Sequence, residues 1–277
     1  MRVLLVEDNP VNRLVAQRLL DTLGVEVCTA DNGQLALQQL DNDLFDAVLM
    51  DCQMPVLDGY QATTRWRQQE LLSGQQRLPV IAMTANAMAG DRQRCLEAGM
   101  DDYLSKPVDR TALAQCLARW WQAERPIAAA QNAHSLPAQA DDQSEESLPS
   151  TPASQSDAPA LDTGVLDELA EVIGQQVTQV IQLFLADAPV LVDAMQLAAG
   201  NHDLEALREA AHSLKSASAN VGAMGLAEAA RRIELGARNN ALERPQVAVA
   251  LLIAEFARTR MALRGYLSCR PSVSVEH

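Results

Sequence analysis

The sequence predicts two domains of different fold class, an α/β domain followed by an all-α domain. Over residues 1–122, short apolar runs alternate with amphipathic helical stretches, which is the pattern of a doubly wound parallel sheet. Over residues 161–268, helical periodicity continues without such runs and indicates a helical bundle. Residues 123–160 are rich in Ala, Ser, Gln, Asp and Pro, so we expect a flexible linker between the domains. A chain of 277 residues is long enough for two domains of ordinary size.

Five apolar runs define the expected strands of the first domain. They lie at 2–6, 26–30, 47–50, 80–83 and 103–105. After the first run, apolar residues recur at helical spacing, with Pro10 in the first turn and Gly24 as a stop signal. Similar amphipathic stretches follow the later runs. Strands that alternate with helices in this way predict a five-stranded parallel sheet.

The second domain is expected to contain five helices. They lie near 163–173, 175–198, 203–221, 223–239 and 246–267. Glycine and asparagine pairs interrupt the helical pattern between them, as in short loops. Long amphipathic helices joined by short loops predict an antiparallel bundle. We interpret residues 269–277 as a tail, whose last three residues are consistent with the remnant of an affinity tag.

Composition and charge argue against several classes of partner. The formal net charge is -14 and the pI is about 4.7, so the chain repels phosphate backbones and anionic lipids. We therefore expect no nucleic-acid binding and no membrane contact by this segment. We also expect no apolar run of the ~18 residues that span a bilayer. Five scattered cysteines without metal-ligand spacing are typical of free thiols in a reducing, cytoplasmic location.

Polar residues directly follow four of the five expected strands. They are Glu7 and Asp8 after the first, Asp51 after the third, Thr84 after the fourth and Lys106 after the fifth. In an open parallel sheet such residues meet at the carboxyl edge, where the strand order reverses. Clustered carboxylates favour Mg²⁺, and an aspartate can accept a phosphoryl group as an acyl phosphate. The cation, the lysine and the hydroxyl can then stabilise the transferring group.

These residues lie in motifs that closely resemble response-regulator receiver domains. The motifs are LLVEDNPVNR at 4–13, VLMDCQMPVLDGYQAT at 48–63, VIAMTANAM at 80–88 and GMDDYLSKPVD at 99–109. The resemblance implies a flavodoxin-like sheet with strand order 2-1-3-4-5. It also implies that Asp51 is the phosphoacceptor.

The same resemblance assigns the other site residues of the first domain. Asp8, Asp51 and the backbone carbonyl of Gln53 would bind Mg²⁺ directly, and Glu7 would act through water. Thr84 and Lys106 would contact the phosphoryl group. Tyr103 would be the rotating aromatic of the output face, and the bond before Pro107 would be cis.

His212 is the one histidine of four that falls inside an expected helix. The helix has an apolar stripe through Leu207, Ala211 and Leu214, and we expect His212 to point away from it onto a polar, solvated face. An exposed histidine of no special function fits this pattern. So does a nucleophile, because a solvated imidazole is largely neutral near pH 7 and can attack an acyl phosphate. Lys215, one turn on, would steady the incoming charge.

The segment AHSLKSASANVGAMGL at 211–226 resembles the histidine-containing phosphotransfer (HPt) family, a four-helix bundle. The segment VIQLFLADAPVLV at 180–192 matches the family as well. The resemblance implies that His212 is the phosphorylated histidine. The family usually has glycine after the lysine, whereas this chain has Ser216. Serine is also small, so we expect function to survive.

Together the two sites predict two steps of a bacterial two-component phosphorelay. The phosphoryl group would reach Asp51 from an upstream histidine kinase, move to His212, and leave for a downstream response regulator receiver. We expect self-catalysed phosphorylation and dephosphorylation of Asp51, and no ATP-binding kinase domain in this chain. The amino-acid sequence of the receiver motifs favours the C-terminal portion of a hybrid sensor histidine kinase over a stand-alone protein.

Two other functions remain open on the sequence alone. The chain could be a non-catalytic interaction module that sequesters two-component partners. It could also be a metal-dependent hydrolase that uses the same acid cluster. An intact set of receiver residues together with His212 favours the relay over both.

Overall fold

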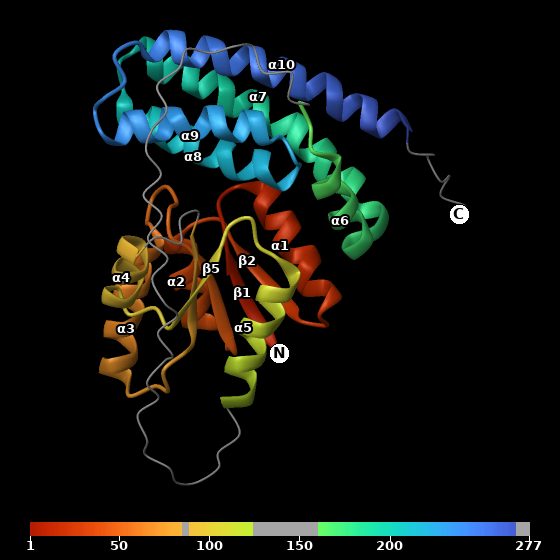
Figure 1. Cartoon of the computed structure of the whole chain (residues 1–277). Helices are drawn as coiled ribbons and strands as arrows, with labels where there is room; N and C mark the ends of the chain where they lie inside the picture. The colour runs from red at the N-terminus through yellow and green to blue at the C-terminus, as the bar shows by residue number, and fades with distance from the viewer. Residues whose placement is uncertain (85–88, 124–159, 270–277) are drawn as a thin grey trace.

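The computed structural model describes residues 1–84, 89–123 and 160–269. These residues form an α/β domain with a helical domain stacked on one edge of its sheet (Figure 1). Almost all of the predicted linker and tail, and residues 85–88 of the third receiver-like motif, lie outside the described residues. The predicted domain boundaries therefore stay predictions, flanked by helices that end at Ala123 and begin at Thr163.

The sheet contains five parallel strands in the order β2-β1-β3-β4-β5, as predicted. They are β1 (Arg2–Val6), β2 (Glu26–Ala30), β3 (Ala47–Asp51), β4 (Val80–Thr84) and β5 (Asp102–Ser105). Strands β3 and β4 are buried throughout, which explains why their sequences are nearly continuous apolar runs. The strand order reverses between β1 and β3, so the loops after these two strands border the expected site.

Helices cover both faces of the sheet. They are α1 (Pro10–Thr22), α2 (Gly33–Asn42), α3 (Gly59–Ser73), α4 (Ala89–Glu97) and α5 (Arg110–Ala123). Alternate residues of β1 point to opposite faces. Val3 and Leu5 join a core with α1 and α5, whereas Leu4 and Val6 join a core with α2, α3 and α4.

Asn9 starts α1 as its N-cap, because its side-chain oxygen accepts hydrogen bonds from the backbone N–H groups of Val11 and Asn12. The cap fixes the direction in which the chain leaves the acidic residues at the end of β1. At the opposite side of the site, the Lys106–Pro107 bond is cis, as the resemblance implied. Both features lie in loops at the carboxyl edge of the sheet.

The second domain contains the five helices predicted, each within about three residues of its expected bounds. They are α6 (Thr163–Ile173), α7 (Val177–Gly200), α8 (Leu204–Asn220), α9 (Met224–Arg238) and α10 (Pro245–Cys269), with a 3₁₀ turn at Gly174–Gln176. One expectation needs correction, because Thr163–Gly200 is long and apolar enough to cross a membrane by length and composition. In the structure, α7 buries Val177, Ile181 and Phe184 in the bundle, and 33% of the apolar window lies inside the protein.

The two domains meet through α1. Figure 1 shows the bundle lying across the carboxyl edge of the sheet, with α1 beneath α8 and beside α6. Val11 and Val15 of α1 belong to the same apolar cluster as Phe184 and Leu214 of the bundle. The edge of the sheet that carries the acidic residues therefore faces α8.

Candidate functional site

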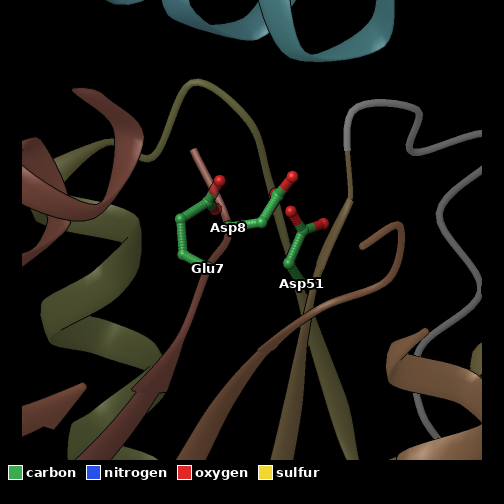
Figure 2. Close-up of side chains that lie close together, drawn as sticks. All are labelled: Glu7, Asp8 and Asp51. Carbon is green, nitrogen blue, oxygen red and sulfur yellow. The ribbon is translucent and has the colours of Figure 1, made fainter. Parts of the chain in front are cut away.

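Glu7, Asp8 and Asp51 converge at the carboxyl edge of the sheet. Figure 2 shows Glu7 and Asp8 directly after β1 and Asp51 at the end of β3, with their carboxylates grouped together. One ligand oxygen from each carboxylate lies within 4.8 Å of the others. Glu7 and Asp51 are buried, and Asp8 is partly buried. Three oxygen ligands at this spacing suit a hard divalent cation such as Mg²⁺.

Lys106 reaches into this cluster from the loop after β5. Its Nζ donates hydrogen bonds to Glu7 Oε2 and to Asp51 Oδ2, each at 2.6 Å. Burial alone would lower the pKa of Lys106, but the charges of Asp51 and Glu7 outweigh it and raise this pKa above its usual value. The ammonium group therefore stays charged, and it holds the two carboxylates at fixed positions.

The charge of the cluster is not balanced by Lys106 alone. Burial raises the pKa of Asp51; Lys106 opposes this rise, whereas the charges of Glu7 and Asp8 add to it. Burial and the charge of Glu7 also raise the pKa of Asp8, to about 6. Three carboxylates that share one ammonium leave negative charge uncompensated. A bound cation would relieve it, so the donor set and its charge both fit Mg²⁺.

The remaining predicted residues of the first domain lie around this cluster or on its flank. The backbone N–H of Gln53 donates to Asp51 Oδ1 at 3.1 Å, so the peptide after the strand wraps the carboxylate. Thr84 is buried at the end of β4, one residue beyond the partner of Asp51 in the sheet. Tyr103 lies on β5, 38% exposed, with the guanidinium of Arg92 5.9 Å from its ring centre.

His212 lies on α8 and is only 8% exposed, so the expectation of a solvated histidine is wrong. The expectation rested on one helix in isolation, whereas Glu234 of α9 binds the His212 ring, and α1 of the first domain and its N-cap bond to α8 at Ser213, Ser216 and Asn220. A cleft of about 720 Å³ between the domains is lined by Asp8 and Gln53 on one side and by His212 on the other. One carboxylate of the acid cluster, Asp8, and the imidazole of His212 thus border the same cleft.

Glu234 on α9 holds the His212 ring, although it was not predicted from the sequence. Its Oε1 lies 2.8 Å from His212 Nδ1, and its Oε2 accepts a hydrogen bond from Lys215 Nζ at 2.6 Å. Burial alone would raise the pKa of Glu234, but His212 and Lys215 lower it to about 2. A charged carboxylate can only accept, so Nδ1 must be the donor.

This geometry sets the chemistry of the imidazole. Burial lowers the pKa of His212 below its usual value, although Glu234 opposes that change, so the ring is neutral near pH 7. A neutral ring that donates through Nδ1 keeps its lone pair on Nε2, which makes Nε2 the nucleophilic atom. Lys215, expected to steady an incoming charge, is bound to Glu234 in this structure.

One signal in the sequence could have identified Glu234. It stands at helical spacing within the apolar stripe formed by Ala227, Ala230 and Ala237, all buried in the structure. An acid at a core position is costly unless it is paired, so it marks a partner on a neighbouring helix. Which partner it has could not be read from the sequence, because His212 and Glu234 lie on different helices.

Comparisons with known proteins agree with both halves of the structure. Residues 3–118 match the model of the response regulator receiver domain, and residues 179–262 match that of the Hpt domain. The sensor protein GacS of Pseudomonas syringae pv. syringae is 35% identical over 246 residues, which cover 87% of this chain and 25% of that protein. The virulence sensor protein BvgS of Bordetella parapertussis is 33% identical over 275 residues, 98% of this chain and 21% of that protein.

The chain thus spans about a quarter or less of the length of these relatives. Among solved structures, the receiver domain of a sensor histidine kinase from Pseudomonas aeruginosa, described with a magnesium ion coordinated in its active site cleft, is 50% identical. The match covers 43% of this chain and 95% of that one, with a TM-score of 0.40.

Proposed function

Since residues 3–118 form a response regulator receiver domain and residues 179–262 an Hpt domain, this chain is a phosphorelay signalling protein, and we propose that it passes a phosphoryl group between Asp51 and His212. The observation that carries the proposal is the cleft between the domains. Asp8, which belongs to the acid cluster with Glu7 and Asp51, borders it on one side, and His212 borders it on the other. The cluster that contains Asp51 therefore reaches the cleft through Asp8, and His212 lies on the wall that the bundle contributes.

The first step would load the receiver. A carboxylate oxygen of Asp51 attacks the phosphorus of a phosphorylated histidine on an upstream kinase, and the P–N bond breaks as the O–P bond forms. Lys106, held within 2.6 Å of the acceptor carboxylate, places a positive charge beside the transferring group. Asp8, Asp51 and the Gln53 carbonyl would hold Mg²⁺, with Glu7 acting through water, and the bound ion supplies further positive charge to the phosphoryl oxygens.

The second step would move the group to the bundle. His212 Nε2 attacks the phosphorus of the acyl phosphate, and the O–P bond to Asp51 breaks and leaves a free carboxylate. The attacking ring gains positive charge as the N–P bond forms. Glu234, bound to Nδ1 at 2.8 Å, lies where it stabilises that charge. Thr84 would bond a phosphoryl oxygen on Asp51 before the transfer.

The partners and location of the chain belong to the same proposal. We propose an upstream histidine kinase and a downstream response regulator receiver as its partners. We also propose that the chain is the C-terminal portion of a hybrid sensor histidine kinase and lies in the cytoplasm. Its match to a limited part of two longer sensor proteins supports the assignment as part of such a protein.

A radiolabelled phosphotransfer assay tests the proposal. The full chain, Asp51→Ala and His212→Ala are each incubated with Mg²⁺ and a phosphorylated histidine kinase. The label should require Asp51 and then appear at His212 as an acid-labile, base-stable phosphohistidine. His202→Asn is the matched control, because His202 is exposed and asparagine tolerates its positive φ of 56°.

Three outcomes would count against the proposal. Label that stops at Asp51 would reduce the bundle to a binding module. A chain that takes no label, under conditions that label another receiver, would favour the non-catalytic interaction module. A His212→Ala chain that carries as much phosphohistidine as the intact chain would show that another histidine accepts the phosphoryl group.

A further inference from the structure

The side-chain amide of Asn12 lies between the two domains and uses all three of its polar positions there. Its Nδ2 donates to Glu7 Oε1 at 3.0 Å within the receiver and to Ser216 Oγ at 2.9 Å on α8. Its Oδ1 accepts a hydrogen bond from Asn220 Nδ2 at 2.8 Å. An amide offers two N–H donors and one carbonyl, and here each has a partner. Asn12 and Ser216 are both 6% exposed, so these bonds lie largely out of reach of water.

Ser216 connects this amide to the helical turn that carries His212. Its hydroxyl lies 3.3 Å from the carbonyl oxygen of His212 and 3.2 Å from that of Ser213, to either of which it donates. Donation in that direction leaves the oxygen lone pairs for Asn12. Nearby, Asn9 Nδ2 donates to the Ser213 carbonyl at 3.3 Å. Two asparagines of the receiver, Asn9 and Asn12, therefore bind the helical turn that carries His212.

We propose that Asn12, Ser216 and Asn220 form a docking clasp that selects this chain's own receiver as the resting partner of the His212 face. The inference rests on the proposed phosphotransfer function and adds to it a determinant of partner choice. Ser216 is the departure from the glycine that HPt domains usually carry, and a glycine would offer no side-chain acceptor to Asn12. The departure thus creates a bond that a receiver without a hydrogen-bond donor at this position cannot make.

The clasp also makes the chain's own receiver compete with other receivers for access to His212. His212 lines the cleft between the bundle and the chain's own receiver, so a second receiver that collects the phosphoryl group must first displace that receiver. Weakening the clasp should expose His212 more often and slow the transfer from Asp51. Ser216 and Asn220 are positioning residues in this scheme, because they act on the placement of Asp51 relative to His212.

The exposure of His212 can be measured by acylation with diethyl pyrocarbonate, read by mass spectrometry on the full chain. His202 is exposed and provides an internal reference for the reagent. Ser216→Ala and Asn220→Ala each remove one clasp bond and leave Glu7 and Asp51 untouched. Each should raise the acylation rate of His212 relative to His202 by about fivefold, the effect of one hydrogen bond. Each should also slow the Asp51-to-His212 transfer.

Ser218→Ala is the matched control on the same helix. Ser218 is fully buried, and its hydroxyl has no hydrogen-bond partner among the residues that the structure describes. Its removal should leave the acylation of His212 and the transfer rate unchanged. Asn12→Ala removes both clasp bonds, so it should raise the acylation of His212 more than Ser216→Ala does. The double variant Asn12→Ala/Ser216→Ala should show less than the product of the two effects, because both substitutions remove the Asn12–Ser216 bond.

The clasp would be refuted if Ser216→Ala and Asn220→Ala protected His212 as well as Ser218→Ala does. It would also be refuted if the protection of His212 in the intact chain vanished on dilution, since a second copy would then supply the covering receiver. A failure of the proposed function looks different. In that case no label reaches His212 in the intact chain, whatever the acylation experiment shows.

Discussion

Replacement of Glu234 by glutamine tests how the bundle prepares its histidine. The carboxylate is 3% exposed and binds both His212 Nδ1 and Lys215 Nζ. Glutamine keeps the shape and one acceptor oxygen but removes the charge that stabilises the ring during attack. A hydrogen bond to a charged group contributes about 1.5–3 kcal/mol. Because each 1.36 kcal/mol is tenfold in rate, Glu234→Gln should slow transfer from Asp51 to His212 about ten- to hundredfold.

The assay is single-turnover transfer in the full chain, started from receiver-loaded protein and followed by acid and base stability of the label. The pKa of His212, read by NMR, should fall further in the variant, because Glu234 is the group that raises it. Glu228→Gln is the control, since Glu228 lies on the same helix and pairs with Arg231 at the surface. Transfer in Glu234→Gln as fast as in Glu228→Gln would refute the role of the charge.

Three further predictions follow from the same geometry. The lowered pKa of His212 keeps the ring neutral to lower pH, so the transfer rate should stay level as pH falls through 6.5 and decline only below it; a pH–rate profile that halves at or above 6.5 would contradict this. Removal of Mg²⁺ with a chelator should abolish labelling of Asp51, because without the cation the negative charge of the three clustered carboxylates is not neutralised. The circular dichroism spectrum should stay unchanged. Labelling that survives the chelator would assign the chemistry to Lys106 alone. Phe184→Ala should lower the free energy of unfolding, measured in urea, by about 3–5 kcal/mol, since Phe184 is fully buried. Leu251 is 70% exposed, so Leu251→Ala should leave the free energy of unfolding within about 0.5 kcal/mol of that of the parent.

The receiver site could be predicted from the sequence because its geometry follows from local rules. Four of the five apolar runs are followed by the polar residues of the site, and parallel strands bring those residues to one edge of the sheet. Asp51 and Lys106 are 55 positions apart in sequence, and the parallel sheet brings both to its carboxyl edge although β4 lies between their strands. The helix bounds of the bundle were predicted for a similar reason, since amphipathic periodicity and loop residues are local signals.

The surroundings of His212 could not be predicted in this way. Helical spacing places the histidine on the polar face of α8, and this is correct for the isolated helix. The burial of His212 depends on its neighbours from other elements, including Glu234 of α9, and no pattern within α8 identifies them. Asn12 was visible as part of a motif, but its bonds to Ser216 and Asn220 exist only once the domains dock. Contacts of this kind require the relative placement of two domains.

The central claim is that Asp51 passes its phosphoryl group to His212 of the same chain. The most direct test follows the transfer over a dilution series of the loaded full chain, alongside a mixture of Asp51→Ala and His212→Ala chains. We predict that phosphohistidine in the intact chain forms with a first-order rate independent of protein concentration, and that the mixture is slower at every dilution. A rate that falls in proportion to concentration, or a mixture that equals the intact chain, would contradict the claim.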